Sequence, residues 1–75
     1  MKCGSFKLIR GKKWTETNSD GSFNWEEKRR DSSSIYLTDL SRGYNIKLDL
    51  KSKKVLFESA GNYVDNRGYN ITTFK

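Results

Sequence analysis

Proline and histidine are absent from this 75-residue sequence, and cysteine occurs once, at Cys3. A single cysteine cannot form a disulfide within the chain, and without histidine neither a serine–histidine nor a cysteine–histidine catalytic pair can be assembled. Histidine and cysteine are also the usual protein ligands of zinc, copper and haem. The composition therefore predicts a protein that is not an enzyme and that holds no metal or other cofactor.

Long hydrophobic runs are missing as well. No stretch has the about 7–15 consecutive apolar residues of a signal peptide, or the about 20 that a membrane-spanning helix needs. For the chain as given, we therefore expect a cytoplasmic protein with no membrane partner.

Carboxylate pairs are the one catalytic arrangement that this composition leaves open, because glycosidases use two acidic side chains. Such a pair needs a cleft in which one carboxyl group is shielded from water, and so short a chain has little volume for one. Lysine and arginine outnumber the acids 15 to 9, so ordinary ion pairing accounts for the carboxylates. We expect them to have no catalytic role.

Positive charge is in excess: the net charge is +6 and the isoelectric point is near 9.6. Such an excess favours anionic partners, either nucleic acid or an acidic protein. Solubility alone explains a similar charge in many small domains. The charge therefore narrows the class of partner without identifying it.

Aromatic residues provide most of the material for a core. The sequence has two tryptophans, four tyrosines and four phenylalanines, and each buries about 150–250 Å² of surface. Residues 1–75 are therefore predicted to fold as one domain, although a chain this short buries little of its surface. A homo-oligomer that covers a further face would fit the same composition.

Alternation of apolar and polar residues runs through most of the chain. The clearest stretch, residues 34–57, contains three such runs separated by short polar segments. Side chains two positions apart on a strand share a face, so each run is typical of a strand with one buried side. We predict strands over residues 5–10, 12–17, 22–28, 35–37, 44–50, 55–57 and 68–74.

Short polar segments connect these strands. Asp20-Gly21 predicts a hairpin turn over residues 18–22, because glycine accepts the positive φ that such turns require. Residues 28–33 have no apolar side chain and are predicted to form a loop, and residues 58–67 a longer one. The expected fold is all-β: a single small antiparallel meander of six to seven strands, curled into a barrel or compact sandwich.

A five-residue repeat stands out. The sequence RGYNI occurs at residues 42–46 and again at 67–71, each time after a tyrosine, an apolar residue and an aspartate. One interpretation is structural: the glycine frees the backbone, the tyrosine and isoleucine point inward, and the arginine pairs with the upstream aspartate. The other is functional, with two equivalent ligand contacts on a pseudo-symmetric sheet. Core burial alone explains the spacing, which favours the structural interpretation.

Nucleic-acid binding is the sharpest functional hypothesis. Cations would neutralise phosphates while interleaved aromatic rings stack on bases. The alternative for the same rings is burial in the core. The candidate ligand-binding residues are Lys12, Lys13, Trp14, Arg42, Tyr44, Lys47, Arg67 and Tyr69.

Carbohydrate binding is a second hypothesis. Small β domains hold sugars with one exposed ring and with planar polar side chains. The segment from Asn62 to Arg67, which includes Asn66, offers such groups, as does the segment around Asn18, Asp20 and Asn24. The two copies of RGYN would then form pseudo-equivalent sites, although the same residues are common in turns.

Protein interaction is the third hypothesis and the one that we favour. A basic β domain can dock on an acidic partner or extend its sheet through an edge strand. Lysines at positions 12, 13, 51, 53 and 54 protect edges from such pairing, which weakens the second variant. The sequence therefore indicates a non-catalytic binding module for an acidic protein or another anionic macromolecule.

Overall fold

The computed structural model describes residues 2–65 and 68–74, and these form strands and turns only. No helix that could cross a membrane occurs among them. The strands are β1 (Lys2–Arg10), β2 (Lys13–Asn18), β3 (Gly21–Arg30), β4 (Ser34–Asp39), β5 (Tyr44–Asp49), β6 (Lys54–Ser59), β7 (Asn62–Val64) and β8 (Tyr69–Phe74).

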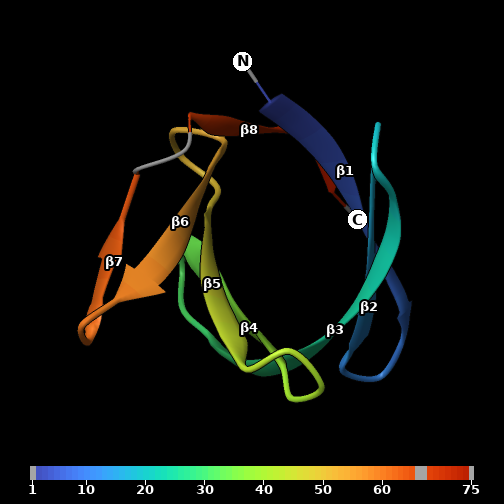
Figure 1. The fold of residues 1–75 in the computed structure, drawn as a ribbon, viewed down its shortest axis with the longest axis horizontal. Coiled ribbons are helices and arrows are strands. Elements are labelled where there is room, and N and C mark those ends of the chain that lie inside the picture. Colours follow the sequence, from blue (N-terminus) through green and yellow to red (C-terminus); the bar gives the residue numbers. More distant parts are fainter. Residues whose placement is uncertain (1, 66–67, 75) are drawn as a thin grey trace.

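Seven of these strands close into a barrel. Each of β1 to β6 pairs antiparallel with the next strand in the chain, and β8 lies between β6 and β1. Figure 1 shows the resulting ring, with β7 outside it against β6. The predicted all-β meander, curled into a barrel, is confirmed.

The strand pair that closes the barrel is parallel. Lys2 of β1 lies opposite Tyr69 of β8, and Gly4 lies opposite Ile71. Direction alternates along a meander, so in a ring with an odd number of strands the first and last must run the same way. The seventh strand therefore requires this one parallel pair, which alternation along the sequence does not reveal.

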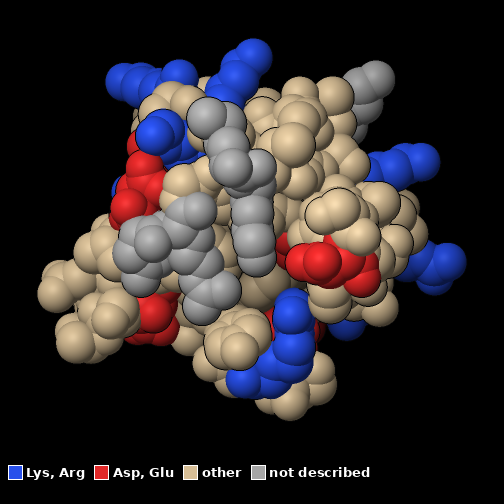
Figure 2. Space-filling view, turned by 45° about the horizontal axis from the view of Figure 1, so that its top comes forward, with Lys and Arg blue, Asp and Glu red and all other residues tan. Residues whose placement is uncertain are grey.

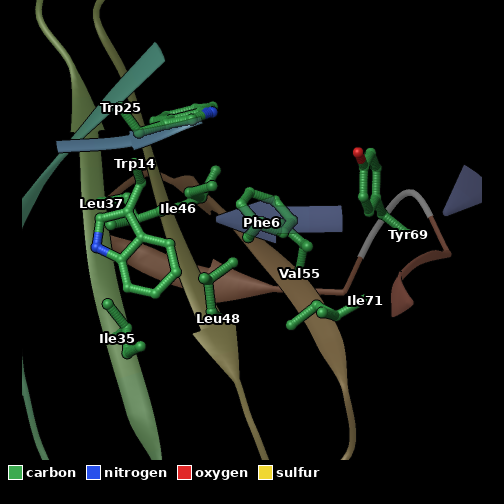
Figure 3. Close-up of a cluster of buried hydrophobic side chains, with 10 residues drawn as sticks. All are labelled: Phe6, Trp14, Trp25, Ile35, Leu37, Ile46, Leu48, Val55, Tyr69 and Ile71. Atoms are coloured by element: carbon green, nitrogen blue, oxygen red, sulfur yellow. The ribbon is translucent and has the colours of Figure 1, made fainter. Parts of the chain in front are cut away.

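The barrel interior is filled by side chains from all seven closing strands (Figure 3). Trp14 and Trp25 lie directly opposite each other on β2 and β3 and are 2% and 4% exposed. Burial of two such rings contributes several kcal/mol in a core of this size, at about 25 cal/mol per Å². The remaining members of the cluster are Phe6, Ile35, Leu37, Ile46, Leu48, Val55, Tyr69 and Ile71.

Two segments predicted as loops contain strand. The polar residues 28–30 continue β3, because they pair with β4 past a bulge between Glu27 and Arg29 while their side chains stay exposed. Residues 62–64, within the predicted long loop, form β7 and reverse the chain at Ala60 and Gly61, both at positive φ. The polar side chains of both segments correctly indicated exposure to solvent. They did not indicate a loop, because strands pair through backbone hydrogen bonds and need no apolar side chains.

Strand β7 covers part of the outer surface. Its Tyr63 packs edge-on against Tyr36 of β4, with ring centroids 5.5 Å apart. The Arg29 guanidinium lies 4.0 Å from the same Tyr36 ring and the Lys47 ammonium lies 5.5 Å from it. Tyr36 is thus only 9% exposed although it points outward. This packing, in which burial raises the pKa of Tyr63, holds the extra hairpin on the barrel.

Candidate functional site

The two ends of the barrel differ in charge because of the topology. In an up-and-down meander, alternate turns lie at the same end. The turns at residues 11–12, 31–33 and 50–53 therefore share one end, and those at 19–20, 40–43 and 60–61 share the other. We call the second end the mouth.

The first end carries nine of the fifteen lysines and arginines, and we call it the basic end. Three of the nine are paired with a described carboxylate: Lys13 with Glu26, Arg30 with Glu27, and Lys54 with Asp65. The other six have no ion pair in residues 2–65 and 68–74. The nine residues are Arg10, Lys12, Lys13, Lys28, Arg29, Arg30, Lys51, Lys53 and Lys54.

Two carboxylates near the basic end accept hydrogen bonds from backbone amides of its turns. Asp31 accepts a hydrogen bond from the Ser33 amide, which lowers the pKa of the Asp31 carboxyl, and Asp49 accepts one from the Lys51 amide. These hydrogen bonds stabilise two of the turns at the basic end. The face shown in Figure 2 has Lys and Arg mostly at its periphery, with Asp and Glu among them.

A buried carboxylate organises the mouth. Glu16 is 7% exposed and accepts hydrogen bonds from the Trp25 indole at 2.9 Å, from the Asn18 amide at 2.9 Å and from the Tyr69 hydroxyl. The Asn18 amide lies 3.0 Å from the Tyr69 oxygen as well. Burial, together with the Glu16 carboxylate, raises the pKa of the Tyr69 hydroxyl. The network links β2, β3 and β8, and so spans the parallel closure.

A second tryptophan–glutamate pair lies further along the same two strands. The Trp14 indole donates to Glu27 at 3.0 Å, and the Arg30 guanidinium donates to both oxygens of that carboxylate at 2.7 and 2.8 Å. The Arg30 hydrogen bond lowers the pKa of the Glu27 carboxyl, against the opposing effect of burial.

Arg42 packs against three aromatic residues of the mouth. Its guanidinium carbon is 4.8 Å from the ring centroid of Phe23, 5.1 Å from that of Trp25 and 5.2 Å from that of Tyr44. Asp39 holds the guanidinium from the opposite side of the turn. Hydrogen bonds from Ser41 and Arg42 lower the pKa of the Asp39 carboxyl to about 2.

Acid is expected to remove the stabilisation that the Asp39 carboxylate gives to this turn. The Asp39 pKa is depressed in the folded state, so its stabilising contribution is complete above the unfolded pKa of about 3.8 and is lost as the pH falls toward 2. Unfolding followed at pH 2, 3, 4 and 5 should show a decline below pH 4 in the wild type. Asp39→Asn should be less stable at pH 5 and flatter below it, and an identical pH slope in both proteins would contradict this role.

The two copies of the repeat are used differently. Gly43 and Gly68 are both at positive φ, Ile46 and Ile71 are both buried, and Arg42 pairs with its upstream Asp39 as expected. The tyrosines differ: Tyr69 is 5% exposed and Tyr44 is 50% exposed. Tyr44 and Tyr69 nevertheless line one pocket. The structure thus brings the two copies to a single mouth.

The predicted site residues fall into three groups. Lys12 and Lys13 are at the basic end, whereas Lys47 lies beside Tyr36 on the outer surface. Trp14 lies in the core, so its ring presents no face to a ligand. Arg42, Tyr44 and Tyr69 meet at the mouth. Asn66 and Arg67 lie outside the described residues.

Some residues of the mouth carried a sequence signal that the strand pattern obscured. Trp14-Thr15-Glu16 and Trp25-Glu26-Glu27 each place a carboxylate two positions from a tryptophan, on the same face of a strand. An acid on a core face beside an indole donor is a candidate for a buried hydrogen bond. Phe23 and Asn18 carried no comparable signal, because their roles depend on strand pairing.

The mouth contains a pocket of about 130 Å³ with an acidic floor and aromatic walls. The described residues contain no cluster of three or more acidic or cysteine side chains that could hold a metal ion. Residues that line the pocket include Glu16, Asn18, Asp20, Phe23, Tyr44 and Tyr69.

Comparison of the chain with protein-family models, with curated proteins and with solved structures finds no match.

Proposed function

We propose that this protein is a non-catalytic binding module that docks an acidic protein on its basic end. The observation that carries the proposal is the placement of nine of fifteen cations in three turns, or on the strand residues next to them, toward one end of a closed barrel. Six of them have no described carboxylate partner, so an incoming acidic surface would face charges that are not already neutralised. Such complementarity steers encounter and selects the partner.

The aromatic residues favour an acidic protein over a single-stranded nucleic acid. Stacking on bases requires exposed rings beside the cations. Trp14 and Tyr69 are buried, and the Tyr36 ring is covered by Arg29, Lys47 and Tyr63. None of these three rings has a free face beside the cations of the basic end, which favours docking through charge.

Removing charge from the turns should weaken this interaction far more than removing it elsewhere. The variant K12A/K51A/K53A lowers the net charge by three, and these side chains are exposed. We expect its affinity for polyglutamate to fall about tenfold or more, since each exposed ion pair contributes about 0.5 kcal/mol. Fluorescence anisotropy at about 20 mM and 300 mM salt measures this, and binding should disappear at the higher salt.

A matched control distinguishes the effect of where the charges lie from the effect of the net charge of the protein. The variant S19D/S22D/S59D has the same net charge as the triple alanine variant, but its changes lie at exposed positions near the mouth. We expect it to retain most of the affinity for polyglutamate. Equal losses in both variants would contradict a role for the basic end. Tighter binding to a DNA oligonucleotide than to polyglutamate under the same conditions would move the proposal to nucleic acid.

A further inference from the structure

We infer that the pocket at the mouth binds a small organic cation, such as a quaternary ammonium group, between aromatic rings and the Glu16 carboxylate. This inference goes beyond the proposed function, because it concerns the opposite end of the barrel and a ligand of opposite charge.

The first argument is that the mouth already holds a cation among aromatic rings. Three rings, those of Phe23, Trp25 and Tyr44, lie within 5.2 Å of the Arg42 guanidinium. The electron-rich faces of such rings attract cations, and quaternary ammonium ligands are bound in cages of this kind. The chain's own arginine thus occupies one side of an aromatic cage, and the pocket lies beside it.

The second argument is the charge of the pocket floor. Glu16 is buried, yet all three of its hydrogen-bond donors are neutral groups, on Trp25, Asn18 and Tyr69. It forms no ion pair with any described lysine or arginine. A carboxylate withdrawn from water usually has a cation near it. A cationic ligand in the pocket would supply that charge.

The third argument is the charge balance of the lining. Arg42 is the one lysine or arginine among the described residues that line the pocket, and Asp39 already pairs with it. Asp20 lines the pocket in addition to Glu16. The local charge is therefore negative although the chain as a whole is positive. Tyr44, which also lines the pocket, is half exposed and so is accessible to a ligand.

Titration with choline tests the inference directly. We expect saturable shifts of mouth resonances in two-dimensional NMR spectra with choline or tetramethylammonium. The neutral isostere 3,3-dimethylbutan-1-ol should bind at least about fivefold more weakly, because it lacks the attraction between charge and ring. Methyl glucopyranoside should cause no saturable shift. Comparable binding of the neutral alcohol, binding of the sugar instead, or no saturation by either cation would each overturn the inference.

Variants in one turn provide the matched control. Tyr44→Ala should weaken choline binding about fivefold or more, whereas Tyr44→Phe, which keeps the ring, should retain it. Leu40→Ala, at an 82% exposed position of the same turn and outside the pocket, should leave binding unchanged. Equal affinity in Tyr44→Ala and wild type would overturn the inference. K12A/K51A/K53A should bind choline with the affinity of the wild type. Loss of polyglutamate binding and loss of choline binding can therefore be told apart.

Discussion

Replacing Glu16 with alanine is expected to lower the free energy of unfolding by about 2–5 kcal/mol, because each buried donor left without its acceptor costs about 1–3 kcal/mol. The substitution leaves the Trp25 indole, the Asn18 amide and the Tyr69 hydroxyl without their acceptor. A domain of this size has about 4–11 kcal/mol of total stability, so the variant would lose much of it. Urea unfolding followed by tryptophan fluorescence measures the change.

Glu26 provides the control for this substitution. It also lies on the β2–β3 hairpin, but its side chain is 47% exposed and its only ion pair is with Lys13 at 3.5 Å. Glu26→Ala should change the free energy of unfolding by no more than about 0.5 kcal/mol. Similar losses in the Glu16 and Glu26 variants would show that the buried network contributes no more than a surface ion pair.

Replacing Gly4 with alanine is expected to destabilise the protein by about 1–3 kcal/mol, the usual range for overpacking. A Cβ atom at this position would lie 2.1 Å from the Tyr69 hydroxyl oxygen and 3.2 Å from the Thr17 carbonyl oxygen. The tyrosine cannot move aside freely, because its hydroxyl is held by Glu16 and Asn18. The added methyl group therefore either displaces that hydroxyl or shifts β1.

A double-mutant cycle tests the mechanism. Tyr69→Phe removes the oxygen that the new Cβ would meet, so Gly4→Ala should cost less in the Tyr69→Phe background than in the wild type. Both thermal and urea unfolding can report the four free energies. Strict additivity of the two substitutions would show that the alanine acts through the backbone of β1 and not through contact with Tyr69.

Both predictions concern the seam of the barrel, which is the parallel pair of β1 and β8 that closes it. Gly4 lies on β1, Tyr69 on β8 and Glu16 on β2, so the hydrogen bond from Tyr69 to Glu16 links β8 to β2 across β1. The parallel pair has a bulge between Gly4 and Ser5. Among the described residues, β8 meets β6 at one register position, Lys54 opposite Asn70. Side-chain packing at this seam therefore supplements a short backbone ladder.

Sequence reasoning succeeded where the signal is local. The hairpin at Asp20-Gly21 follows from a residue that accepts an unusual backbone angle, because Gly21 has φ of 130°. Ion pairing of Arg42 with Asp39 follows from their separation of three residues across one turn. None of these features depends on how distant strands meet.

Sequence reasoning missed features that depend on the register between strands. Alternation marked Trp14 as an inward residue, but it did not show that Trp25 would donate to Glu16 across the β2–β3 pair. The gathering of cations at one end could have been found, because a predicted meander already places alternate turns together. The net charge of the whole chain does not reveal it, because the lysines and arginines must be assigned to one or the other end of the barrel.

Alone, the amino-acid sequence determined that this chain forms strands, and it determined most of the residues that lie inside them. A period of two is a property of neighbouring residues, so it survives without knowledge of the fold. Only the tertiary structure decided that seven strands close the ring, that Tyr69 is buried while Tyr44 is half exposed, and that Glu16 lies beneath a pocket. Those outcomes depend on which strands become neighbours after closure, and local alternation is the same for every such arrangement.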